Sequence, residues 1–132
     1  MPIAPSDLGI ARLRSSRNVP QTIEKIEQVL NAHGVTIFAN IDFSGDAARA
    51  GLSLRPEQML IFGNPKAGTP LMQSAPEAGL DLPLKALVWE DDQGATWIGY
   101  NTPEYIVGRH GLPEPLVANL AGAIALLVQA TS

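Results

Sequence analysis

Apolar residues recur along this chain at two spacings, and each spacing predicts one kind of element. The segment 20–33 carries Ile23, Ile26 and Leu30 on one face of a helix, and Gly34 follows as the expected C′ residue. Further helices are predicted, mainly from capping residues, over residues 42–51, 69–79, 102–110 and 113–130.

Short apolar or alternating runs predict strands at 9–14, 35–41, 58–62, 84–90 and 95–100, the first of them an edge strand. The last two flank four turn-forming residues, Asp91 to Gly94, and therefore predict a hairpin with Trp89 and Trp97 near one another. Because no strand is joined to the next by a repeating full-length helix, an α+β sandwich with helices packed on one face is favoured over a doubly wound parallel sheet.

Asp42 ends the predicted strand 35–41. Its carboxylate is expected to cap the following short helix, or alternatively to line a cleft, and Ser44 and Asp46 are the other candidate caps.

The most informative break in the chain follows the apolar run 59–62. That run stops at Gly63-Asn64-Pro65, and Thr69 is then the expected N-cap of a new helix with Pro70 at N1. A strand, a rigid loop and a helix start would place backbone N–H groups, Lys66 and Thr69 on one small surface, which suits a polar or anionic ligand.

The candidate ligand-binding residues of this segment are Asn64, Lys66, Gly68 and Thr69. The spacing differs from a nucleotide-binding P-loop, which needs its Lys directly before the Ser or Thr. A purely structural interpretation stays open, in which the glycines permit positive φ and the polar side chains satisfy loop and cap hydrogen bonds.

Several stretches resemble one known family in order along the chain: GVTIFANID (34–42), LRPEQMLIFGNPKAGTPLMQ (54–73), GLDLPLKALVWED (79–91) and YNTPEYIVGRHGL (100–112). They are similar to the DUF302 family, a domain of unknown function. The resemblance implies a compact α+β fold of the TBP-like kind with a mostly antiparallel sheet. Family members often carry a His directly after the Asp that corresponds to Asp42, whereas this chain has Phe43, so no role of that His is carried over.

Arg109 and His110 lie at the end of the predicted helix 102–110, where the helix C-terminus favours cations. They are also candidates for ligand binding, and His110 is a candidate acid–base group because its pKa is ordinarily near neutral. His33 has the same helix-end explanation. Two His, scattered carboxylates and no Cys do not form a metal-ligand pattern, so no metal is expected and any cofactor is left unknown.

Length and composition limit the classes of function. With 132 residues, of which 45% are hydrophobic, we expect one domain over 1–132. A net charge of −4 argues against nucleic acid and anionic membrane as partners. The apolar segment 116–128 is too short to cross a bilayer and is expected to form a homodimer interface, and the lack of a signal peptide at the N-terminus makes a cytoplasmic location the default.

The sequence leaves three interpretations of the function. The favoured one is a small binding domain that takes a polar or anionic ligand at residues 63–69 together with Arg109 and His110. The alternative is a small enzyme of the lyase, isomerase or hydrolase type with His110 as acid or base. A structural interaction module is the third interpretation.

Overall fold

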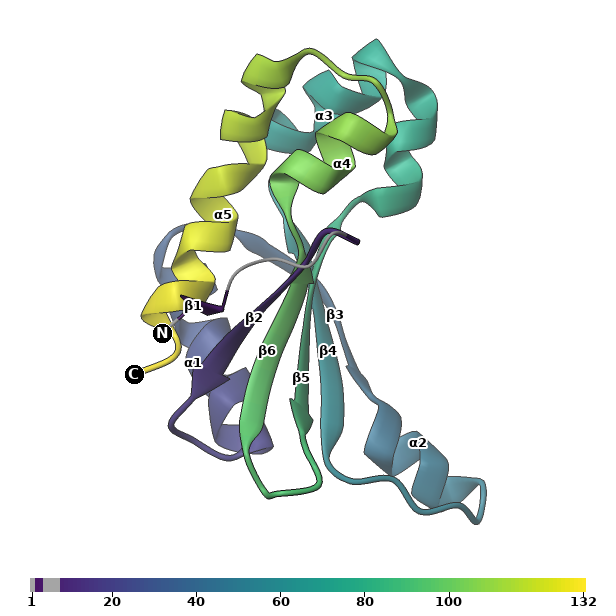
Figure 1. Ribbon diagram of the computed structural model, residues 1–132, viewed down its shortest axis with the longest axis vertical. Coiled ribbons are helices and arrows are strands. Elements are labelled where there is room, and N and C mark those ends of the chain that lie inside the picture. Colours follow the sequence, from purple (N-terminus) through teal and green to yellow (C-terminus); the bar gives the residue numbers. More distant parts are fainter. Residues whose placement is uncertain (1, 4–7) are drawn as a thin grey trace.

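One six-stranded sheet forms the centre of the computed structural model, which describes residues 2–3 and 8–132 (Figure 1). Its strands are β1 (Pro2–Ile3), β2 (Ile10–Ser15), β3 (Thr36–Asp42), β4 (Glu57–Gly63), β5 (Leu84–Glu90) and β6 (Thr96–Asn101). The order across the sheet is β1-β2-β6-β5-β4-β3, and all neighbouring pairs are antiparallel.

The prediction that residues 9–14 form an edge strand is wrong in its position. Strand β2 pairs with β6 on one side and with β1 on the other. The outer strand has only two residues. Such a short strand has no hydrophobic period to detect in a sequence, because alternation needs at least four residues to be distinguished.

The predicted hairpin is confirmed. Strands β5 and β6 are joined by a turn in which Gly94 has a φ of +82°, and Trp89 lies opposite Trp97. Asp91 holds this turn together: its Oδ1 accepts from the backbone N–H groups of Gln93 and Ala95, and its Oδ2 accepts from Nε1 of Trp97 at 2.9 Å. The hydrogen bond from Trp97 is the largest of the causes that hold the pKa of Asp91 below its usual value.

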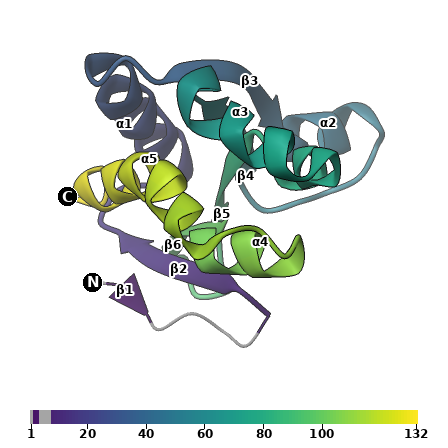
Figure 2. The ribbon, with the colours of Figure 1, turned by 90° about the horizontal axis from the view of Figure 1, so that it is seen from above.

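Two long helices, α1 (Val19–Ala32) and α5 (Val117–Gln129), cover one face of the sheet (Figure 2). Helix α1 starts at a capping box, in which Asn18 accepts from the backbone N–H of Gln21, and ends before Gly34, whose φ is +71°. Their buried side chains join alternate strand residues in a single core, whose largest fully buried members are Phe62, Leu13, Ile26, Leu30, Leu60, Leu71, Ile98, Ile106 and Leu127. The predicted α+β architecture is therefore confirmed.

The shorter helices lie at the ends of the sheet (Figure 1). Helices α3 (Pro65–Ser74) and α4 (Pro103–Arg109) and the 3-10 helices η1 (Pro76–Asp81) and η2 (Glu114–Leu116) gather at one end. Helix α2 (Phe43–Arg49) projects at the other end. Helix α4 agrees with the sequence, since Thr102 caps it and Gly111 follows with a φ of +61°.

Asp42, rather than Ser44 or Asp46, caps helix α2. Its Oδ1 accepts from the backbone N–H of Gly45 at 3.0 Å and from Oγ of Ser44 at 2.8 Å. These bonds lower the pKa of Asp42, the one from Gly45 most. The helix starts directly where β3 ends, so the last strand residue is the cap, and the candidate caps further along are wrong.

Across the residues that the structure describes, no helix is both long enough and apolar enough to cross a membrane.

Candidate functional site

Helix α3 begins at Pro65 with Asn64 as its N-cap, so the predicted start at Thr69 and Pro70 is wrong. Asn64 is extended, and its Oδ1 accepts from the backbone N–H of Lys66 at 2.9 Å. Asn-Pro and Thr-Pro both have the pattern of a cap followed by a proline. Asn64-Pro65 starts the helix because β4 ends at Gly63. Pro70 therefore lies inside the helix, which loses one backbone hydrogen bond there.

Because α3 starts at Pro65, the backbone N–H groups that could have bound an anion are already hydrogen-bonded to Asn64. The backbone N–H of Lys66 is bonded to the Asn64 side chain, and those of Ala67 and Gly68 are bonded to the Asn64 carbonyl oxygen at 2.9 Å each. Pro65 has no N–H. No open backbone anion cradle is therefore present among the described residues of this helix start.

Gly68 has a structural role that differs from the sequence interpretation. Neither Gly63 nor Gly68 has a positive φ. A Cβ at Gly68 would lie 3.8 Å from Cδ1 of Leu82, so the glycine leaves space beside Leu82. That space belongs to a pocket.

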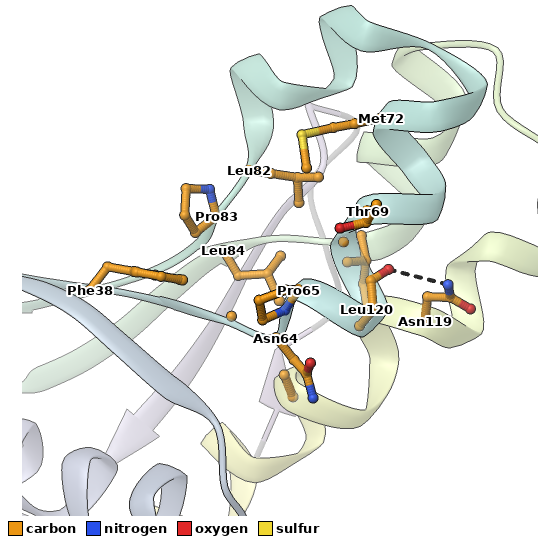
Figure 3. Close-up of a pocket in the computed structure, with 14 residues that line it drawn as sticks. Phe38, Asn64, Pro65, Thr69, Met72, Leu82, Pro83, Leu84, Asn119 and Leu120 are labelled. Carbon is orange, nitrogen blue, oxygen red and sulfur yellow. Dashed lines mark hydrogen bonds between the residues drawn. The ribbon is translucent and has the colours of Figure 1, made fainter.

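The pocket lies between the first turns of α3, the segment 82–84 and helix α5 (Figure 3). Its volume is about 230 Å³. Apolar side chains and glycines make most of the wall, and the lining residues are Phe38, Gly63, Asn64, Pro65, Ala67, Gly68, Thr69, Met72, Leu82, Pro83, Leu84, Asn119, Leu120 and Ala123.

Two of the lining side chains are unusually accessible for apolar groups. Phe38 is 53% exposed and Met72 is 39% exposed, although both line the pocket. The deeper wall includes Leu84 and Leu120, which are buried. The pocket is therefore open to solvent on one side and apolar in depth.

Three polar side chains line the same pocket. Asn119 of α5 donates from Nδ2 to the carbonyl oxygen of Ala67 at 3.2 Å and so fixes α5 against α3 (Figure 3). Asn64 uses its Oδ1 for the cap, which leaves its amide group as a donor. Thr69 is exposed and brings a hydroxyl that can donate or accept. A ligand here would meet apolar walls and a few neutral hydrogen-bonding groups.

Arg109 and His110 form a separate cluster with Asp81. Nη1 of Arg109 donates to both carboxylate oxygens of Asp81, at 3.1 and 3.0 Å, and Nε2 of His110 lies 2.6 Å from Asp81 Oδ2. The side chains of His110 and Asp81 are only 8% and 11% exposed. The cluster joins the end of α4 to the end of η1, and none of its three members lines the pocket.

The predicted site residues thus divide into three groups. Asn64, Gly68 and Thr69 line the pocket, Lys66 is exposed and outside its lining, and Arg109 and His110 lie in the Asp81 cluster. Among the described residues, no three His, Asp or Glu side chains gather where they could hold a metal ion.

Sequence reasoning missed the residues that complete the pocket from other elements. Phe38, Met72 and the segment 82–84 give no chemical signal in a sequence, since each is an ordinary apolar residue or a proline. Asn119 did give a chemical signal in the sequence, because it is a lone polar residue within the apolar stretch 116–128.

Comparison with known families gives a match over most of the chain. The family model described as "Domain of unknown function DUF302" matches residues 11–127. A solved structure with the same family in its name, "uncharacterized conserved protein DUF302 from Bacillus stearothermophilus", superposes with a TM-score of 0.82 over 94% of this chain and 98% of that one. The two sequences are 22% identical, so this likeness concerns the fold alone.

Curated relatives are longer proteins. The "Fluoride-specific ion channel FluC 1" of Brucella suis biovar 1 and the "Fluoride-specific ion channel FluC 2" of Brucella melitensis biotype 1 are each 41% identical to this chain over 106 residues, or 80% of it. Those residues make up 42% and 39% of the two relatives. The chain therefore spans about two-fifths of the length of the relatives it matches. The names of these relatives refer to the whole, longer proteins.

Proposed function

The chain belongs to the DUF302 family. We propose that it is a small-molecule-binding domain whose ligand occupies the pocket beside α3. The observation that carries the proposal is the pocket itself, which has open apolar walls and brings together residues from β3, α3, α5 and the segment 82–84. Concave, mainly apolar sites with a few convergent polar groups are the usual form of small-molecule sites.

The pocket also limits the class of ligand. Apolar cavities of about 150 Å³ hold a benzene-sized molecule, so a volume of about 230 Å³ suits one with on the order of ten non-hydrogen atoms. Its apolar part would contact Leu82, Leu84 and Leu120, and one polar group would face Asn64 or Thr69. A small ring compound with a single hydroxyl, amide or carbonyl group has this form.

This ligand is less polar than the sequence predicts. The expectation of a polar or anionic ligand depended on Lys66 and on free backbone N–H groups. Lys66 lies outside the pocket lining, and the backbone N–H groups of Lys66, Ala67 and Gly68 are bonded to Asn64. The neutral groups of Asn64, Thr69 and Asn119 support a neutral ligand better, because no charged side chain of the described residues lines the pocket.

Native mass spectrometry of gently purified protein tests the proposal, with phenol and indole as added probes if no molecule is carried from the cell. The informative variant is Ala123→Leu, which fills the pocket from α5 and keeps a strong helix former. Its matched control is Ala121→Leu, an exposed position of the same helix outside the lining.

The proposal expects the extra mass in the wild type and in Ala121→Leu, and its loss in Ala123→Leu. An equal amount of bound mass in both variants would place the ligand elsewhere. No bound mass in any of the three proteins, with or without the probes, would contradict a binding function of this pocket.

A small enzyme is the second candidate, favoured by one observation. Asp81 orients the nearly buried imidazole of His110, and a carboxylate that orients a His is part of many acid–base sites. The described residues contain no nucleophile bonded to that His. Turnover in a broad substrate screen that disappears in His110→Gln would support this candidate.

A cytoplasmic location stays an expectation that rests on the sequence. Fractionation of cells that carry the tagged full-length protein checks it.

A further inference from the structure

Among the described residues, no long helix covers the face of the sheet opposite α1 and α5, and the residues of this face form regular rows. In one row Arg14, Trp97, Trp89 and Glu57 lie side by side on β2, β6, β5 and β4. In the next row Arg12, Gly99, Leu87, Met59 and Ile41 run from β2 to β3. We call the residues of these two rows the open face.

The open face is too apolar for a surface that faces only water. Antiparallel sheets with one solvated face normally carry polar side chains on it, yet both tryptophans of the chain and Leu87 and Met59 lie here, half-buried. A hollow of about 810 Å³ lies over the second row, and the ring of Trp89 lies on Gly99. Leu8, which is 73% exposed, lines this hollow, and Leu54, which is 46% exposed, lines a second hollow beside Glu57 and Trp89.

The charges on the open face have opposite signs at its two sides. The Cζ atoms of Arg12 and Arg14, on β2, each lie 5.7 Å from the centre of the Trp97 ring. Glu57, on β4, lies two strands beyond Trp97 in the same row, and no ion pair to its carboxylate is formed by the described residues. Two arginines on β2 and a glutamate on β4 therefore flank an aromatic centre. Asp91, which accepts from Nε1 of Trp97, is also close enough to Arg14 for that charge to help lower the pKa of Asp91.

We propose that the open face binds the open face of a second copy of this chain. A two-fold axis parallel to the strands and between β5 and β6 places β2 of one copy opposite β4 of the other. Arg14 of each copy then faces Glu57 of the other copy, which gives two such contacts, and Trp97 of each copy faces Trp89 of the other. Such self-complementarity is what an isologous two-fold interface requires, and two sheets pack face to face with their strands nearly aligned.

This surface replaces the terminal helix as the basis of the predicted homodimer. Four apolar side chains of α5 are buried within the chain itself. Its accessible side offers mainly small residues, with Val128 at 43% exposure as the large one. The open face has two tryptophans and two arginines, which are residue types enriched in interfaces, and Glu57 as a charge complementary to the arginines. The inference does not depend on a ligand in the α3 pocket.

Charge reversal tests the proposed interface directly. Sedimentation velocity of the wild type should show a species of twice the 14.0 kDa of one chain. Arg14→Glu alone and Glu57→Arg alone should each weaken the dimer by about tenfold or more, because like charges then face each other twice. An equimolar mixture of the two variants should recover the dimer, since both charge contacts of the mixed dimer then join an acidic side chain to a basic one.

Matched controls separate this interface from α5 and from a general effect of charge. Glu24→Arg, an exposed reversal on α1, and Val128→Arg, on α5, should leave the dimer unchanged. Because both tryptophans lie on the open face, dilution of the wild type should also shift their fluorescence to the red as the dimer dissociates.

Three results would overturn the proposal. The first is a wild type that is monomeric up to about 100 μM, the range of a weak but specific complex. The second is a mixture of the two charge variants that dimerises no better than either alone. The third is a dimer that Val128→Arg abolishes and the open-face variants do not.

Discussion

Helices α3 and α4 lie at the same end of the sheet (Figure 1). The pocket beside α3 and the Asp81 cluster at the end of α4 nevertheless use their side chains in opposite ways. In the cluster, the side chains of Arg109 and His110 both bind the carboxylate of Asp81. In the pocket, apolar walls enclose space that none of the described residues fills. Arg109 and His110, which the sequence singles out, are thus engaged with Asp81. The accessible space is lined mainly by apolar residues, together with the neutral groups of Asn64 and Thr69.

Leu120→Ala should have the largest effect, because it removes a wall of the pocket that is also part of the core. Leu120 is 2% exposed, so the free energy of unfolding should fall by about 2–5 kcal/mol. The enlarged pocket should then accept indole-sized probes more readily than phenol. Chemical denaturation measures the first effect and calorimetric titration the second.

The control for this variant is Leu80→Ala, at a side chain that is 69% exposed and outside the pocket. Its stability should change by less than about 0.5 kcal/mol. A loss as large as that of Leu120→Ala would mean that truncation of any leucine at this end of the molecule is costly.

Asp81→Ala should break the cluster without removing the pocket. It leaves His110 and Arg109 without their acceptor, and a partly buried unpaired polar group costs about 1–3 kcal/mol, with the exposed Arg109 contributing least. Thermal unfolding of the variant measures the loss.

Asp81→Asn is the matched variant, because it keeps one of the two acceptor oxygens and removes the negative charge. It should lose less stability than Asp81→Ala and retain probe binding. A folded Asp81→Asn protein that no longer binds any probe would make the cluster part of the site and end the distinction between the two regions.

Asp91→Asn should have a smaller, pH-dependent effect, since Asp91 is another carboxylate whose bonds are all formed within the chain. Its pKa is below the usual 3.8 in the folded protein, so its ionised form stabilises the fold above that pH. This contribution disappears as the pH falls through the folded pKa. The difference in Tm between wild type and variant should therefore be constant near neutral pH and vanish in acid. A difference that grows on acidification would contradict the assignment.

Lys66→Ala should have the smallest effect. The side chain is exposed and lies outside the pocket lining, so the affinity for a neutral probe should not change. Calorimetric titration with phenol checks this. A loss of about tenfold, or about 1.4 kcal/mol, would restore the anionic ligand that the sequence predicts.

Elements with a strong local signal could be predicted from the sequence. The apolar stripe of α1, the turn from Asp91 to Gly94 and the cap at Thr102 each determine their own structure within a few residues. The start of α3 could not, because Asn64-Pro65 and Thr69-Pro70 are equivalent as local signals. The choice between them depends on where β4 ends in the folded sheet.

The candidate site was predictable only in part for the same reason. Asn64, Gly68 and Thr69 were found because they are close in sequence and have distinctive side chains or backbones. The opposite wall comes from residues 82–84 and from α5, and only tertiary packing brings it there. His110 was identified as a chemical group, but its partner Asp81 is 29 positions away and has no spacing rule that points to it.

Methyl NMR spectra recorded during a titration with indole test the central claim most directly. The account predicts saturable shifts for the methyl groups of Leu82, Leu84 and Leu120, unchanged in Ala121→Leu and lost in Ala123→Leu. Saturable shifts confined to other parts of the molecule, or shifts at these three leucines that persist in Ala123→Leu, would contradict a ligand site in the pocket.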